Sequence, residues 1–146
     1  MGLPRMSEAL SATPAEGGQP VVISVCVSCK THGEDGADTL GHRVHAALQE
    51  AAAAAGANVV IQPVQCMSVC KRPCTAALSS AGRYTYIFGD LDAANGPAAL
   101  LDCAKAYVQQ EHGYLLWRER PEPLRRGIVA RIPPAGWLTA DGRHPR

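Results

Sequence analysis

The sequence lacks a charge excess of either sign. Its 146 residues carry 14 Lys and Arg against 13 Asp and Glu, which gives a formal net charge of +1 and a pI of about 7.7. Such an even balance creates no strong electrostatic field. Proteins that bind nucleic acids or anionic membrane surfaces use such a field to attract their partners. We therefore expect no nucleic acid and no membrane among the partners.

Long apolar runs are missing as well. No stretch approaches the roughly 20 apolar residues that a membrane-spanning helix needs. Residues 1–20 contain several prolines and glycines but no continuous apolar segment of the kind found in secretory signals. We expect 1–20 to be a disordered extension and the protein to be cytoplasmic.

Cysteine, in contrast, is well represented, with six residues. Cys26 and Cys29 form a C-x2-C pair, Cys66 and Cys70 form a C-x3-C pair, and Cys74 follows four residues later. The cytosol keeps thiols reduced, so these spacings indicate metal or redox chemistry rather than structural disulfides. Two such pairs together provide a four-thiolate ligand set, which suits zinc or an iron–sulfur cluster.

Each cysteine pair follows a predicted buried strand. The β-branched segments Val21–Val25 and Asn58–Gln65 predict two strands, and the apolar stripe of Leu40–Ala55 predicts a helix between them, capped by Asp38. Such a βαβ unit has parallel strands, whose carboxyl ends meet at one edge of the sheet. The two cysteine pairs are therefore expected to lie close together at that edge.

The second half of the chain predicts two more strands and a helix. Thr75–Ser79 and Tyr84–Phe88 have the pattern of a β-hairpin, and a second helix is expected to open at Gly96 and to end by Gly113. Cys103 falls on the apolar stripe of this helix, so we place it in the core. The predicted element order is β-α-β-β-β-α.

This pattern divides the chain into three parts. Residues 21–113 are expected to form one metal- or cluster-binding domain. Residues 114–146 are rich in proline and arginine, and we expect them to pack on the domain as extended chain to about Pro134 and to fray at the end.

The element order, with a C-x3-C after the second strand, resembles the thioredoxin-like ferredoxins, which include the small 2Fe-2S subunit of respiratory complex I. There, two cysteines after the first strand and a later C-x3-C hold one 2Fe-2S cluster. The resemblance implies a thioredoxin-like α/β fold with a mixed sheet and helices packed on it. It also implies that Cys26, Cys29, Cys66 and Cys70 are the cluster ligands.

More narrowly, the chain resembles DUF1636, a bacterial family described as predicted metal-binding proteins. The resemblance covers about Val21 to Pro134, and its most specific part is the segment Cys66–Thr75. It implies a metal-binding function.

Three functions remain open for the cysteines. The first is a 2Fe-2S protein that carries electrons or senses redox state for an unidentified partner protein. The second is a zinc-binding structural or metal-handling accessory protein, because four thiolates also suit zinc. The third is a thiol oxidoreductase that uses Cys26 and Cys29, although this leaves Cys66 and Cys70 without a role. With no Gly-rich phosphate loop and no Ser/His/Asp constellation, the chain indicates an electron carrier or accessory protein more than an enzyme.

Cys74 is the fifth cysteine of these two runs, one more than a four-ligand set needs. Pro73 fixes its own φ and biases Arg72 toward an extended conformation, so the chain is already leaving the loop there. We expect Cys74 to lie near the centre without binding it, or to act as an alternative ligand. Lys30, Lys71 and Arg72 border the cysteines and would stabilise a negatively charged centre.

Overall fold

The computed structural model describes residues 19–31, 34 and 38–143. The predicted extension, 1–20, therefore lies outside the described residues except for its last two, as do the final three residues of the chain. Within the described ranges, no helix is long and apolar enough to cross a membrane.

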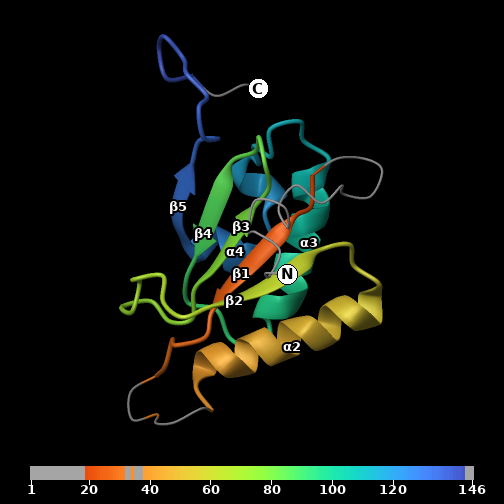
Figure 1. The fold of residues 1–146 in the computed structure, drawn as a ribbon, viewed down its shortest axis with the longest axis vertical. Coiled ribbons are helices and arrows are strands. Elements are labelled where there is room, and N and C mark those ends of the chain that lie inside the picture. Colours follow the sequence, from red (N-terminus) through yellow and green to blue (C-terminus); the bar gives the residue numbers. More distant parts are fainter. Residues whose placement is uncertain (1–18, 32–33, 35–37, 144–146) are drawn as a thin grey trace, which may run out of the picture.

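A five-stranded mixed sheet forms the centre of the domain (Figure 1). Its order is β2-β1-β3-β4-β5, with β1 and β2 parallel and every other neighbouring pair antiparallel. The first four strands are those predicted, with ends that differ by two residues at most. The strands are β1 (Val22–Cys26), β2 (Val60–Val64), β3 (Ala76–Ser79), β4 (Thr85–Phe88) and β5 (Ile128–Ile132).

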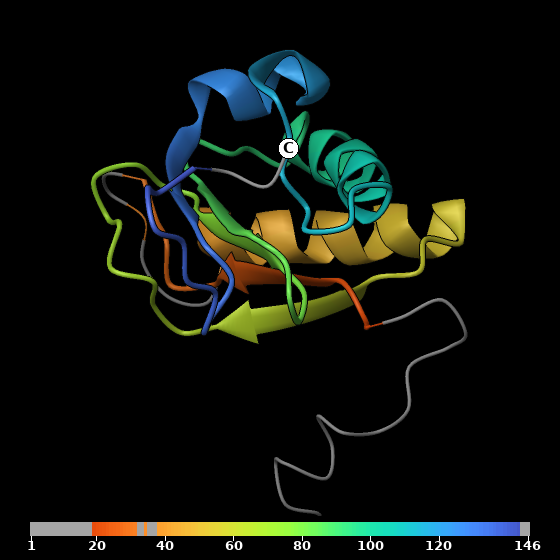
Figure 2. The same ribbon diagram turned by 90° about the horizontal axis from the view of Figure 1, so that it is seen from above.

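The helices lie on one side of this sheet, as Figures 1 and 2 show from two directions. They are α2 (Leu40–Ala55), α3 (Gly96–Val108), the 3-10 turn η1 (Trp117–Glu119) and the short α4 (Glu122–Arg126). Through α3 the element order is β-α-β-β-β-α. The predicted α/β fold, with its mixed sheet, packed helices and element order, is thus confirmed.

The start of α2 differs from the prediction in its cap. Thr39, not Asp38, is the N-cap, and its hydroxyl accepts the N–H of His42 at 3.2 Å. A threonine directly before the first helical residue satisfies a backbone donor that would otherwise lack a partner. Gly41 allows α2 to begin against the end of β1, because a Cβ there would lie 2.2 Å from the carbonyl oxygen of Cys26.

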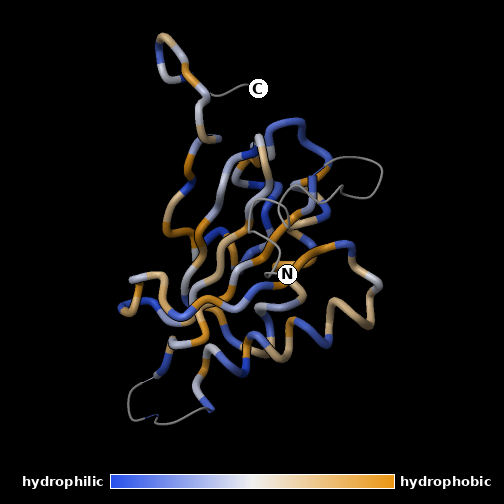
Figure 3. The backbone as a smooth tube through the Cα atoms, viewed as in Figure 1, coloured by the Kyte–Doolittle hydropathy of each residue, from blue (hydrophilic) through white to orange (hydrophobic). Residues whose placement is uncertain are grey.

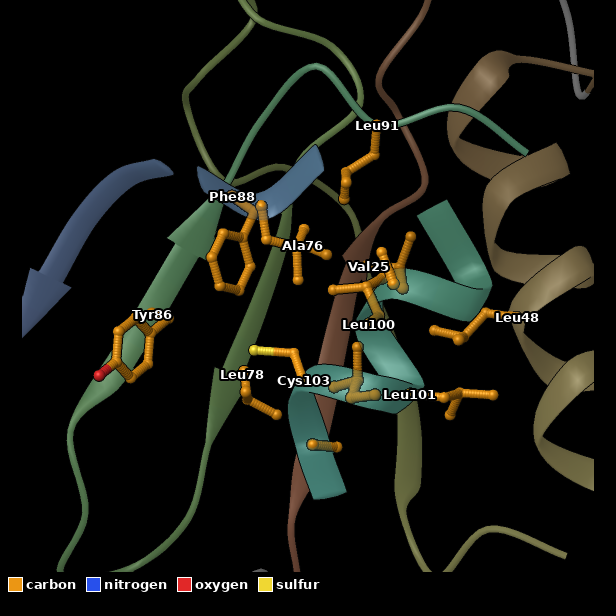
Figure 4. Packing of buried hydrophobic residues seen from close by; sticks show 14 of the residues in the cluster. Val25, Leu48, Ala76, Leu78, Tyr86, Phe88, Leu91, Leu100, Leu101 and Cys103 are labelled. Atoms are coloured by element: carbon orange, nitrogen blue, oxygen red, sulfur yellow. The ribbon is translucent and has the colours of Figure 1, made fainter. Parts of the chain in front are cut away.

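The core lies between the sheet and the helices (Figure 4). Cys103 projects from α3 among these apolar side chains and is fully buried, so its predicted core position is confirmed. Burial raises the pKa of Cys103 to about 12, which keeps the thiol neutral at physiological pH. The largest fully buried side chains are Tyr84, Tyr86, Tyr107, Phe88, Ile23, Leu48, Leu78, Leu100, Leu115, Leu124, Val25 and Val44.

The segment after residue 113 packs on the domain with regular structure rather than as extended chain alone. It contributes η1, α4 and strand β5, which pairs antiparallel with β4. Leu115 and Leu124 from this segment are fully buried, and hydrophobic residues recur along it in Figure 3. Trp137 packs edge-on against Tyr84, with ring centroids 5.8 Å apart. The segment is therefore part of the folded unit.

Candidate thiol site

The two cysteine-bearing loops leave the same edge of the sheet, at the lower left of Figure 1. The first loop follows β1, whose last residue is Cys26, and the second connects β2 to β3. Parallel pairing of β1 with β2 puts their carboxyl ends side by side, with Cys26 opposite Val64. The βαβ argument from the sequence thus located both loops correctly.

Backbone contacts clamp Cys26 between the two ends of the β2–β3 connection. The N–H of Val27 donates to the carbonyl oxygen of Val64 at 2.8 Å, and the N–H of Cys26 donates to that of Thr75 at 3.0 Å. The sulfur of Cys26 lies 4.0 Å from the carbonyl oxygen of Gln65. The C-x2-C loop and the loop that carries Cys66 are consequently in direct contact.

Three thiols are buried together at this edge. Cys26 and Cys29 are 3% and 4% exposed, their thiols interact with each other, and Cys74 is fully buried beside them. Cys29 Sγ lies 3.5 Å from the hydroxyl of Thr75. The Cys74 thiol donates to the carbonyl oxygen of Cys26, with sulfur and oxygen 3.6 Å apart. Cys74 therefore lies directly beside the pair, and its role as a neighbour or alternative ligand stays a prediction.

Cys66 and Cys70 are both exposed on the β2–β3 connection. The sulfur of Cys66 accepts the N–H of Ser68 at 3.3 Å. Among the residues that the structure describes, no three His, Cys, Asp or Glu side chains are arranged to hold a metal ion. The structure thus brings Cys26, Cys29 and Cys74 together but not Cys66 and Cys70, and the four-cysteine ligand set stays a prediction.

The two thiols of the C-x2-C pair differ in their acidity. Burial works to raise the pKa of Cys26, but hydrogen bonds from the Ser28 hydroxyl, the Cys29 thiol and nearby N–H groups outweigh it, so the pKa is lowered. Burial raises the pKa of Cys29, and it raises that of Cys74 strongly, helped by the charges of Cys29 and Cys26. Cys26 is therefore the buried thiol that ionises first.

Arg72 makes its hydrogen bonds to one carboxylate and to two backbone carbonyl oxygens of the C-terminal segment. Its guanidinium pairs with the carboxylate of Asp90 at 2.7 Å and donates to the carbonyl oxygens of Ile128 and Arg126 at 3.0 and 3.2 Å. It thereby ties the second cysteine loop to the C-terminal segment. Lys30 and Lys71, by contrast, are exposed beside the cysteines.

Thr75 is the contact residue that the sequence did not single out. It directly precedes β3, and β3 pairs with β1, so Thr75 lies across from the end of β1 and hence from the cysteines. A threonine that opens a strand is unremarkable by itself. Only knowledge that β3 is the neighbour of β1 could have identified it.

Comparison with known proteins gives three results. The fold is similar to the structure of a thioredoxin-like [2Fe-2S] ferredoxin from Aquifex aeolicus, at 17% sequence identity and a TM-score of 0.45, over 83% of this chain and 100% of that one. No curated protein matches the sequence. The family model of DUF1636, described as a protein of unknown function, matches residues 23–134 and so covers most of the chain, which therefore belongs to this family.

Proposed function

We propose that the protein binds a 2Fe-2S cluster through cysteine thiolates at the carboxyl edge of β1 and β2. The cluster would serve one-electron transfer or redox sensing for a partner protein in the cytoplasm. The observation that supports this is the position of Cys26, whose sulfur lies between Cys29 and the loop that carries Cys66 and Cys70. Four thiols on two touching loops form a donor set of the right chemistry for such a centre.

The residues present fit a 2Fe-2S cluster, because they are thiols and because the two loops that carry them are in contact. Cys26 and Cys29 form a buried pair, and Cys66 follows directly after Gln65, whose carbonyl oxygen contacts Cys26. Because Cys66 and Cys70 face solvent in the structure described, ligation requires their loop to turn them toward the buried pair. When bound, a 2Fe-2S cluster supplies a one-electron redox change.

The backbone around the cysteines suits thiolates. The N–H of Ser68 donates to Cys66 Sγ, and a backbone N–H of Met67 helps to lower the pKa of Cys26. Hydrogen bonds to ligand sulfurs stabilise their negative charge and raise the reduction potential of a centre that they hold. These residues would thus hold and tune the cluster, and the exposed Cys66–Cys70 loop would face the partner.

Metal analysis of protein purified without oxygen tests this proposal. We expect a red-brown protein with about two irons and two acid-labile sulfides per chain. The double variant Cys26→Ser/Cys29→Ser should be colourless, whereas Cys103→Ala should keep the colour, because Cys103 lies in the core on α3. A colourless wild-type protein with one tightly bound zinc would instead establish the zinc-binding structural or metal-handling alternative.

A second candidate function, thiol–disulfide exchange, is favoured by the lowered pKa of Cys26 next to the raised pKa of Cys29. The Cys26 thiolate would attack a substrate disulfide and form a mixed disulfide. Cys29 would then attack the sulfur of Cys26, release the substrate as a dithiol and leave a Cys26–Cys29 disulfide. We rank this second because exchange needs access to the attacking sulfur and Cys26 is only 3% exposed. Reduction of glutathione disulfide by metal-free protein, lost in Cys26→Ser, would favour it.

A further inference from the structure

Thr75 contacts both members of the buried cysteine pair, 46 and 49 positions away from it in sequence. Its carbonyl oxygen accepts the N–H of Cys26 at 3.0 Å, and its hydroxyl oxygen lies 3.5 Å from the sulfur of Cys29. Thr75 is itself fully buried. One residue thus fixes the backbone of the first cysteine and the side chain of the second.

The hydroxyl of Thr75 has the sulfur of Cys29 as its hydrogen-bond partner. A buried hydroxyl without a hydrogen bond costs free energy, and the sulfur of Cys29 is the partner that the structure provides. The neighbouring backbone holds Thr75 in place, because Cys74 and Leu91 exchange two hydrogen bonds, of 3.3 and 3.1 Å. The contact with Cys29 is therefore built into the start of β3.

The direction of this hydrogen bond follows from the state of the sulfur. A protonated thiol can donate or accept, but a thiolate, free or bound to a metal, has no proton and can only accept. The hydroxyl must then be the donor. Whether Cys29 is a thiol or a metal-bound thiolate, a hydroxyl 3.5 Å from its sulfur stabilises the reduced, ligand-competent form of the pair more than a disulfide, whose sulfurs are weaker hydrogen-bonding partners.

We propose that Thr75 is a positioning residue that stabilises the reduced Cys26–Cys29 pair through a hydrogen bond from its hydroxyl to the sulfur of Cys29. This inference rests on the proposed function, in which Cys26 and Cys29 are the working thiols. It adds that the strand opposite the cysteine loop sets their redox equilibrium.

The test compares Thr75→Val, which keeps the shape and removes the hydroxyl, with Thr75→Ser, which keeps the hydroxyl. Metal-free full-length protein is equilibrated with glutathione and glutathione disulfide, and alkylation with mass spectrometry reads each cysteine. Cys26 and Cys29 give up two electrons and two protons and form one disulfide, while glutathione disulfide becomes two glutathione thiols. We expect Thr75→Val to favour the protein disulfide about fivefold, or about 20 mV toward lower potential, and Thr75→Ser to stay within about twofold of wild type.

A second readout uses the loaded protein. Because a donor to a ligand sulfur raises the potential of the centre, the cluster in Thr75→Val should have a lower midpoint potential than in wild type or Thr75→Ser. Thr85→Val is the matched control, because Thr85 lies at the end of β4 that is away from the site. The other end of β4, Phe88, is the one that pairs with Ala76 beside the site. Thr85→Val should change neither readout.

The outcomes separate this inference from the proposed function. If the cluster forms normally in wild type and Thr75→Val behaves like wild type in both readouts, the role of Thr75 is overturned and the proposed function stands. If wild-type protein forms neither cluster nor disulfide, both are overturned. Circular dichroism checks the fold of each variant, and Thr75→Ala replaces Thr75→Val in the comparison if the valine variant does not fold.

Discussion

Cys74 is a buried thiol that is hydrogen-bonded to backbone carbonyl oxygens. Its sulfur lies 3.6 Å from the carbonyl oxygens of both Cys26 and Thr75, and burial raises its pKa far above the ordinary range. A thiol binds metal as the thiolate, so a sulfur that holds its proton for a backbone carbonyl is a poor ligand. This environment favours the expectation that Cys74 lies beside the centre without binding it.

Single Cys→Ser variants purified without oxygen separate ligands from neighbours. We expect serine at Cys26, Cys29, Cys66 or Cys70 to abolish or severely reduce metal content, because a hydroxyl is a much weaker ligand for soft metal centres than a thiolate. Cys74→Ser should keep the metal, since serine can donate the same hydrogen bond to the Cys26 carbonyl. Metal and acid-labile sulfide per chain are the measurements.

One pattern of results would reverse this assignment. If Cys74→Ser emptied the site while Cys70→Ser kept its metal, Cys66 and Cys74 would be the second ligand pair. The C-x3-C spacing would then have no ligand role.

Individual residues were predictable where chemistry or periodicity marks them. The cysteine spacing identified the pair Cys26 and Cys29, and helical periodicity put Cys103 in the core, as the structure has it. The spacing could not show that Cys66 and Cys70 are exposed, because the conformation of a loop depends on contacts that no local pattern records. The sequence did not identify Thr75 as a contact of the cysteines for the same reason.

Among the elements, helix α2 is anchored to the first cysteine loop by one carboxylate. Glu34 Oε2 accepts the N–H of Thr31 at 2.8 Å and that of Leu40 at 3.1 Å, and its other oxygen pairs with Arg43 at 2.5 Å. The hydrogen bonds from Arg43 and from the backbone hold the pKa of Glu34 at about 2 instead of 4.5. Thr31 and Glu34, which follow Cys29, are thereby connected to the first turn of the helix.

This carboxylate predicts an acid-sensitive contact. A carboxyl group whose pKa is lower in the folded than in the unfolded state stabilises the fold above its unfolded pKa, and that contribution is lost as the pH falls through the folded pKa. For Glu34 the loss should run from about pH 4.5 down to about pH 2. Wild type should therefore melt above Glu34→Gln at pH 6, and the difference should shrink toward pH 2.

Thermal unfolding of both proteins at several pH values measures this, and the effect should be modest because the group is exposed to solvent screening. Glutamine keeps a hydrogen-bond acceptor but cannot be charged, so it isolates the charge of Glu34. A constant difference in melting temperature from pH 6 to pH 2 would contradict the assignment.

Elements were predictable in proportion to the length of their pattern. The 16-residue α2 and the β-branched β1 carry clear periodicities, and both lie where the sequence put them. The five-residue α4 begins at a Pro-Glu-Pro sequence and β5 contains an arginine, so neither has a distinct local signal. These two elements form because Leu124 enters the core and β4 offers a free edge.

At the scale of the whole molecule, the C-terminal segment braces the second cysteine loop. Arg72, within that loop, donates to the carbonyl oxygens of Arg126 and Ile128. The N–H of Gly89 also donates to the carbonyl oxygen of Gly127 at 2.7 Å. The sequence predicts that this segment packs on the domain. The contacts of Arg72 give it a mechanical connection to the loop as well.

Two truncations test this connection. Ending the chain after Pro134 removes Trp137 and its packing on Tyr84 but keeps β5 and the contacts of Arg72. We expect this variant to fold and to hold its metal as firmly as the full chain.

Ending the chain after Gly113 removes β5 together with the fully buried Leu115 and Leu124. Truncating one buried leucine side chain costs about 2–5 kcal/mol, and a domain is stable by only about 5–15 kcal/mol, so this variant should be unfolded or nearly so at 25 °C. Circular dichroism melts and the rate of metal loss to a chelator compare the two truncations with the full chain. A cooperative melt near that of the full chain after truncation at Gly113 would show that residues 21–113 fold alone, and that the C-terminal segment contributes neither to the core nor to the support of the cysteine loop.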